Sequence, residues 1–270
     1  MNRSLLKEIE RNNVFDLATK AEQYFFVDFG KISQDSITLN LNEGNYDILV
    51  LCSNNKSLYI NQKEDTNLKL SLLAKNKIGA MKISANLNKK STIALYFADF
   101  SIGESNCSVD INLNEPYASA SWALASLTAQ SDNKEFNVSI YHNAPYTYGL
   151  SNNYGVCKND GKLVFSGTSH IKKGCSKSKT YQNAKIMVFD RLSNGIAKPI
   201  LKIDENDIEA SHAAVVGKIN DDHLYYLTSR GISEATAKEL ITYGYLKPIL
   251  VGFSDKEIAT EINNLIEGRM

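Results

Sequence analysis

Cysteine and histidine are the side chains of this 270-residue sequence best suited to hold a metal. The four cysteines are Cys52, Cys107, Cys157 and Cys175, and no two of them form a Cys-x-x-Cys pair. Cys157, His170 and Cys175 follow one another in a C-x12-H-x4-C order, which matches no standard zinc module. We therefore expect free thiols here, and not a zinc site.

His212 stands apart because it lies among small and β-branched residues, in ASHAAVVG (Ala210–Gly217). Imidazole in such a setting is either a hydrogen-bonded core group or a ligand for a metal. The residues alone leave both interpretations open.

Catalytic motifs are missing from the sequence. It contains no G-x-x-x-x-G-K-[ST] phosphate loop, no H-E-x-x-H and no G-x-S-x-G. Glycoside chemistry needs two carboxylates facing one bond. Asp110 and Glu115 come closest to such a pair, and they lie near an expected turn. No particular enzyme is indicated.

The charges balance, with 30 Lys and Arg against 30 Asp and Glu. This balance argues against a nucleic-acid partner, and HIKKGCSKSK (170–179) is interpreted as a solvated loop. The sequence shows no signal peptide and no apolar run long enough to cross a membrane. We therefore expect a cytoplasmic protein, with no membrane partner and with reduced cysteines.

Alternating polar and apolar residues dominate the region that must position these groups. SITLNLN (36–42) is one example, and similar runs recur about every ten to twelve residues as far as PILKID (199–204). This rhythm is typical of a sandwich, a barrel or a stacked β-solenoid, and it does not choose among them. Trp122 is expected in the core.

From residue 219 onward the pattern becomes helical. Asn220 or Asp221 and Ser233 are plausible N-caps, and Gly231 and Gly244 are plausible helix ends. The first two helices form an αα-hairpin, because the second lacks the basic surface of a DNA-recognition helix.

The expected organisation has three parts. Residues 1–30 form a short helical extension, on the spacing of Leu5, Leu6 and Ile9, residues 31–218 form the β core, and residues 219–270 form a helical domain.

The segment SHAAVVGKINDDHLYYLTSRGISEATAKELITYGYL (211–246) resembles the C-terminal signature of the SufB/SufD family of iron–sulfur cluster assembly scaffolds. HNAPYTYG (142–149) and DGKLVFSGTSHI (160–171) also resemble this family. The resemblance implies a mainly β protein, with a right-handed parallel β-helix (β-solenoid) core and a small C-terminal α-helical domain. It also implies a scaffold without enzymatic activity that pairs with a SufB-type paralogue and binds the ABC-type ATPase SufC.

Within the family, the sequence is more similar to the SufD type than to the SufB type. Asn183 stands where SufB-type chains have the cysteine of a Gln-Cys-Asp stretch, and Ala213 stands where they have a glutamate after the late histidine. Some SufD-type chains have a cysteine two positions before that histidine, and here that position is Ala210. A thiolate from this strand is therefore not expected.

The resemblance also implies roles for individual residues. His212 becomes a candidate ligand of a transient iron–sulfur cluster that forms at the interface with SufB, while this chain alone holds no cofactor. The candidate SufC contacts lie in the first two helices and are Leu224, Tyr225, Leu227, Arg230, Gly231, Ile232, Leu240 and Tyr243. The alternatives are a stand-alone β-solenoid carbohydrate-active enzyme and a homodimeric scaffold.

Overall fold

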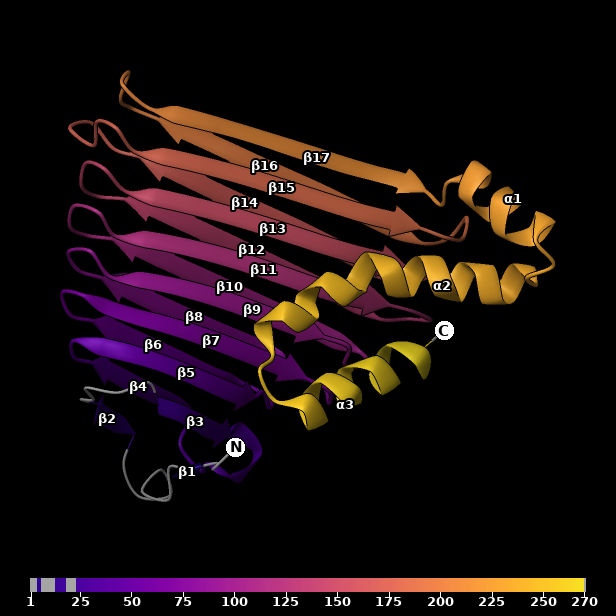
Figure 1. The fold of residues 1–270 in the computed structure, drawn as a ribbon, viewed down its shortest axis with the longest axis horizontal. Helices are drawn as coiled ribbons and strands as arrows, with labels where there is room; N and C mark the ends of the chain where they lie inside the picture. Colours follow the sequence, from indigo (N-terminus) through magenta and orange to yellow (C-terminus); the bar gives the residue numbers. More distant parts are fainter. Residues whose placement is uncertain (1–3, 6–12, 18–22, 270) are drawn as a thin grey trace.

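The computed structural model describes residues 4–5, 13–17 and 23–269. Successive strands alternate between two parallel sheets, so each circuit of the chain adds one strand to each sheet (Figure 1). Among the described residues, the odd-numbered strands form a nine-stranded sheet (the odd sheet) and the even-numbered strands an eight-stranded sheet (the even sheet). The chain is a parallel β-solenoid, which is one of the three architectures that the strand rhythm allows and the one that the resemblance implies.

The strands of the odd sheet are β1 (Ser4–Leu5), β3 (Gln23–Asp28), β5 (Gly44–Leu51), β7 (Thr66–Ala74), β9 (Thr92–Asp99), β11 (Ser119–Thr128), β13 (Tyr148–Cys157), β15 (Lys179–Val188) and β17 (Glu209–Lys218). Those of the even sheet are β2 (Val14–Leu17), β4 (Ser36–Leu41), β6 (Lys56–Gln62), β8 (Gly79–Leu87), β10 (Glu104–Leu113), β12 (Asn133–His142), β14 (Lys162–Ile171) and β16 (Asn194–Ile203). A 3-10 turn, η2 (Phe29–Lys31), follows β3.

The strands pair in register, so equivalent residues of successive strands stack in columns along the solenoid. Side chains alternate between the two faces of a strand, and each column therefore faces either the interior or the outside along its whole length. The interior between the sheets holds the main core, which includes Ile48, Leu70, Leu95 and Phe97. Trp122 lies in this core with none of its surface exposed, as expected.

Four helical segments follow the last strand: α1 (Asp221–Ser229), α2 (Glu234–Leu246), η3 (Lys247–Gly252) and α3 (Lys256–Glu267). They lie where the sequence predicts helices; α2, η3 and α3 cross the outer face of the odd sheet, whereas α1 lies beyond the end of β17 (Figure 1). A second core fills that junction, in which Ile258, Ile262 and Ile266 of α3 pack with Leu73 and Leu127 of the sheet. The helices are therefore stabilised by the solenoid, and the division into separate domains stays a prediction.

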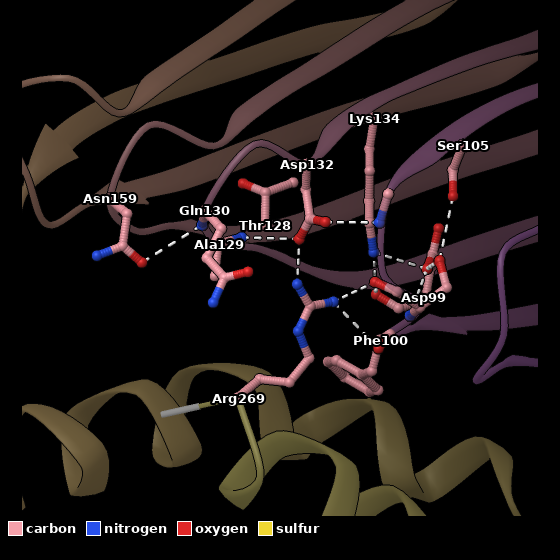
Figure 2. Close-up of polar contacts among 12 residues, drawn as sticks. Asp99, Phe100, Ser105, Thr128, Ala129, Gln130, Asp132, Lys134, Asn159 and Arg269 are labelled. Atoms are coloured by element: carbon pink, nitrogen blue, oxygen red, sulfur yellow. Dashed lines mark hydrogen bonds and ion pairs between the residues drawn. The ribbon is translucent and has the colours of Figure 1, made fainter.

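Arg269, two residues after the end of α3, forms hydrogen bonds that join the C-terminal helices to the solenoid (Figure 2). Its guanidinium donates to the carboxylate of Asp132 and to the carbonyl oxygens of Phe100 and Ser101. Asp132 is almost completely buried, and its carboxylate also accepts hydrogen bonds from two backbone N–H groups of the neighbouring turns. Such charge-assisted bonds are among the strong ones in proteins, so they fix where α3 ends.

A fully buried ion pair lies beside this anchor (Figure 2). Lys134 Nζ lies 2.8 Å from Asp99 Oδ1, and neither side chain has any exposed surface. The same carboxylate oxygen accepts hydrogen bonds from the backbone N–H and the hydroxyl of Ser101. Burial lowers the pKa of Lys134, and the negative charge of Asp99 opposes that shift.

The predicted helical extension over residues 1–30 is wrong for the three described strands of that region and for all but the last two of its described residues, which begin η2. β1, β2 and β3 are strands that pair with the rest of the solenoid, and Phe15 and Phe25 point into its core. Leu6 and Ile9 lie outside the described residues. Pairing with neighbouring strands outweighs the local helix spacing, because it supplies partners for the backbone and covers the apolar side chains.

Candidate functional site

The solenoid ends in a bare edge. β16 and β17 are the last strands of their sheets, and within the described part of the chain no further strand pairs with them. Val215, Val216 and Ile200 are 57%, 43% and 53% exposed on these two strands. Unpaired backbone groups beside exposed apolar side chains are a template for strand addition by another chain.

His212 lies on β17, at the open end of the solenoid interior between β16 and β17 (the mouth). It pairs in register with Gln182, which pairs with Ser151, which pairs with Trp122. Gln182, Ser151 and Trp122 are all buried inside, so this column (the His212 column) faces the interior. His212 is exposed because it occupies the last position of an inward column, where the described chain provides no further turn to cover it.

The interior beneath His212 is polar, in contrast to the aliphatic earlier turns. Trp122 Nε1 donates to Asn153 Oδ1 at 2.8 Å, and Asn153 Nδ2 donates to Ser151 Oγ at 3.2 Å. One level nearer the mouth, Gln182 and Thr180 both donate to Ser169 Oγ, at 2.8 and 2.9 Å. Buried polar groups of this kind orient one another and so define single side-chain conformations.

The HNAPYTYG stretch forms a second polar cluster at the edge of this interior. His142 is completely buried, and its Nδ1 lies 2.7 Å from Thr147 Oγ1. The Thr147 hydroxyl also lies 2.8 Å from Ser178 Oγ and 3.1 Å from the carbonyl oxygen of Ala144, so His142 is part of a buried hydrogen-bond cluster. Gly149 leaves room for the ring, since a Cβ there would come within 2.9 Å of Nε2. Burial, with a smaller contribution from His170, lowers the pKa of His142 to about 4.

The structure does not bring Cys157, His170 and Cys175 together as a metal site. His170 Nε2 lies 2.8 Å from Asp204, whereas the Cys175 thiol donates to the carbonyl of His142 at 3.2 Å. Burial raises the pKa of Cys157 to about 11, which keeps that thiol protonated. Among the described residues no group of three or more His, Cys, Asp or Glu side chains could hold a metal ion. The free thiols expected from the sequence are present.

The carboxylates considered for glycoside chemistry do not form a pair. Asp110 faces outward on β10, and its in-register neighbours on both sides are serines, Ser84 and Ser139. Glu115 lies in the following turn, where its carboxylate accepts a hydrogen bond from the backbone N–H of Lys89. This geometry gives the carbohydrate-active alternative no support.

α1 is the least buried of the three α-helices that follow β17. None of its residues is buried, and Tyr225 and Tyr226 are 73% and 57% exposed. It packs against α2, where Leu240 is 49% exposed (Figure 1). Exposed apolar side chains are common where proteins contact other chains, so α1 and α2 stay the candidate contact surface.

The other predicted contact residues have mixed positions. Leu224, Leu227 and Ile232 are half-buried, and Arg230 and Gly231 are exposed. Tyr243 instead packs in the helix–sheet core, with its hydroxyl donating to Asn263.

The Ser-Arg-Gly-Ile sequence forms the end of α1. The N–H of Gly231 donates to the carbonyl of Thr228, and the N–H of Ile232 donates to that of Leu227. Gly231 has φ of +83°, the left-handed conformation that this C-cap requires. This motif therefore fixes the turn that carries the chain from α1 into α2.

Sequence reasoning missed Gln182, although it lies directly before Asn183 in the stretch TYQNAK (180–185). Its neighbour Asn183 faces outward and donates to Asn152 Oδ1 at 2.9 Å. The alternation of TYQNAK does carry the signal, because Gln182 falls on the inward phase of the strand.

Together, the two parallel sheets, their bare edge and the helices that follow β17 define the class of protein: a parallel β-solenoid with a C-terminal helical layer. Residues 48–245 match the family model described as "SUF system FeS cluster assembly, SufBD core domain", more than half of the chain. The chain belongs to this SufBD core-domain family.

Curated relatives carry the same family signal. SufD of Bacillus subtilis is 33% identical over 137 residues, which cover 51% of this chain and 31% of that protein. SufBD family proteins of Staphylococcus haemolyticus and Staphylococcus aureus are each 30% identical over 131 residues, or 48% of this chain and 28% of theirs. The matched region thus spans about a third of the length of these relatives, and the resemblance to the SufD type is confirmed. Within the described residues, no helix combines the length and apolar character needed to cross a membrane.

Proposed function

We propose that this chain is a SufD-like, non-catalytic scaffold subunit of an iron–sulfur cluster assembly complex. The observation that carries the proposal is the bare β16–β17 edge with His212 at its centre. A SufB-type paralogue adds its own terminal strands to this edge, and a SufC-type ATPase binds the surface made by α1 and α2.

The nascent cluster is the cargo of this assembly. His212 contributes one imidazole nitrogen, a ligand type suited to iron, and the partner contributes the thiolates, because the cysteines of this chain are buried. The polar column beneath the ring fits this role. It includes a buried amide oxygen without a partner, at Gln182, directly next to His212 in register.

The first prediction concerns assembly. Co-expression with the SufB-type and SufC-type proteins of the same cell should give one stable heteromeric complex by size-exclusion chromatography. The double substitution Tyr225→Ala and Leu240→Ala should weaken ATPase binding by about thirtyfold, the effect of removing an interface hot spot, while the SufB-type partner stays bound.

The matched control is Val251→Ala, which removes an equally exposed apolar side chain from η3, outside α1 and α2. It should leave the complex intact. Components that elute separately with the wild-type chain would contradict the proposal. A chain that is dimeric by itself in light scattering would favour the homodimeric scaffold.

The second prediction concerns the cargo. His212→Ala should leave the complex assembled but lower its iron and acid-labile sulfide content. Ser211→Ala, the adjacent residue on the same strand, faces outward and serves as the control. If His212→Ala retains the wild-type cluster content, His212 is not a cluster ligand.

A further inference from the structure

Gln182 is held in one orientation inside the solenoid. Its Nε2 donates to Ser169 Oγ at 2.8 Å and to the carbonyl oxygen of Ile200 at 3.3 Å. A carbonyl oxygen only accepts hydrogen bonds, so the nitrogen of the amide must be on that side and the assignment of Oε1 is unambiguous.

The Oε1 atom of Gln182 is buried and has no hydrogen-bond partner. Its in-register neighbours are Ser151 on one side and His212 on the other. The hydroxyl oxygen of Ser151 accepts from Asn153, and Ser151 makes no hydrogen bond to Oε1. The neighbour on the open side of the column is His212, whose imidazole is a hydrogen-bond donor carried by the adjacent strand, and adjacent strand backbones lie about 4.8 Å apart.

We propose that Gln182 is a positioning residue for His212. Its Oε1 accepts a hydrogen bond from one protonated ring nitrogen and thereby fixes the tautomer and the direction of the ring. The second ring nitrogen is then left with its lone pair directed out of the mouth, toward the bound partner. Histidine ligands of metals are typically oriented through the other ring nitrogen in this way.

The free energy favours a conformation with this hydrogen bond over one in which the His212 ring rotates freely in solvent. A buried acceptor without a partner is disfavoured by about tenfold or more in population, and a single imidazole N–H removes that penalty. A neutral amide also suits the task, because its oxygen accepts one ring N–H and adds no charge beside the ring.

One part of this inference rests on the proposed function, namely that the free ring nitrogen of His212 serves as an iron ligand. The hydrogen bond itself is a property of the isolated chain, so the two can fail separately. If the complex does not assemble, the proposed function fails and the hydrogen bond can still be present. If substitution of Gln182 leaves the His212 ring unchanged, the positioning role fails.

The test uses the isolated, ¹⁵N-labelled chain and reads the ring-nitrogen chemical shifts of His212, assigned by comparison with His212→Ala. The wild-type chain should show one dominant tautomer at neutral pH. Gln182→Met, which keeps the length of the side chain and removes the acceptor, should convert this into the averaged shifts of an unrestrained imidazole. Gln182→Glu keeps an acceptor oxygen and should retain the bonded N–H signal.

Gln62 provides a matched control. It is another buried glutamine whose Nε2 donates to two backbone carbonyls and whose Oε1 has no partner, but it lies on β6, far from the mouth. Gln62→Met should leave the His212 shifts unchanged. In the assembled complex, Gln182→Met should lower cluster affinity by about 10- to 100-fold, as loss of an outer hydrogen-bond partner does at other sites. His212 shifts that are identical in wild type and Gln182→Met would overturn the proposal.

Discussion

Replacing Lys134 by methionine should lower the free energy of unfolding by about 3–5 kcal/mol. The substitution leaves the carboxylate of Asp99 buried without its cation, and breaking one side of a buried ion pair has a cost of this size. Urea unfolding, followed by circular dichroism at constant pH, measures the change.

The double variant Asp99→Asn with Lys134→Met separates charge from packing. With the carboxylate gone, no buried charge is left without a partner, so most of the lost stability should return. Lys177→Met is the surface control, because Lys177 and Asp207 form an ion pair of similar length, 2.9 Å, with both side chains exposed. A loss below about 1 kcal/mol for Lys134→Met would show that the pair is not desolvated as the structure indicates.

Acid should destabilise the solenoid through His142. Burial holds its folded-state pKa at about 4, whereas an imidazole in the unfolded chain titrates near pH 6.5. Between these values the unfolded state binds a proton that the folded state does not, so stability is complete above about pH 6.5 and is lost as the pH falls. Relative to pH 7, protonation of His142 in the unfolded state should lower the free energy of unfolding by about 2 kcal/mol at pH 5 and by about 3 kcal/mol near pH 4.

His142→Asn should flatten that pH dependence. The shorter amide retains a donor for Thr147 and has no proton to gain in this range. Urea unfolding at pH 7 and pH 5 gives the slope for each variant, and His223→Asn, at an exposed position on α1, is the comparison. Equal slopes for wild type and His142→Asn would assign the acid sensitivity to other groups.

Local periodicity predicted the strands well but could not predict how they pair. The run expected at 36–42 is β4, Ser36–Leu41, because alternation can be read within a few residues. Pairing joins residues far apart in the chain, such as Gln182 with His212, and no window of sequence contains both. Three architectures therefore stayed open until the resemblance to a family selected the solenoid.

The same limit explains what was missed at the site. His212 could be identified as unusual from its neighbours, but its place at the mouth depends on the register of β15 with β17. Asp99 and Lys134 were unremarkable in sequence, because charged residues normally face water and only the fold brings these two together inside. At the N-terminus, a few apolar residues at helical spacing were outweighed by strand pairing.

In the proposed pairing, the bare edge would also limit how many chains can join. The last strands of this solenoid pair like those before them, so another chain could in principle add head to tail. Each such addition would again leave an unpaired edge. Two chains that meet tip to tip use both edges at once, and growth stops. In the proposed pairing, such a contact would leave no free edge on which a third chain could add.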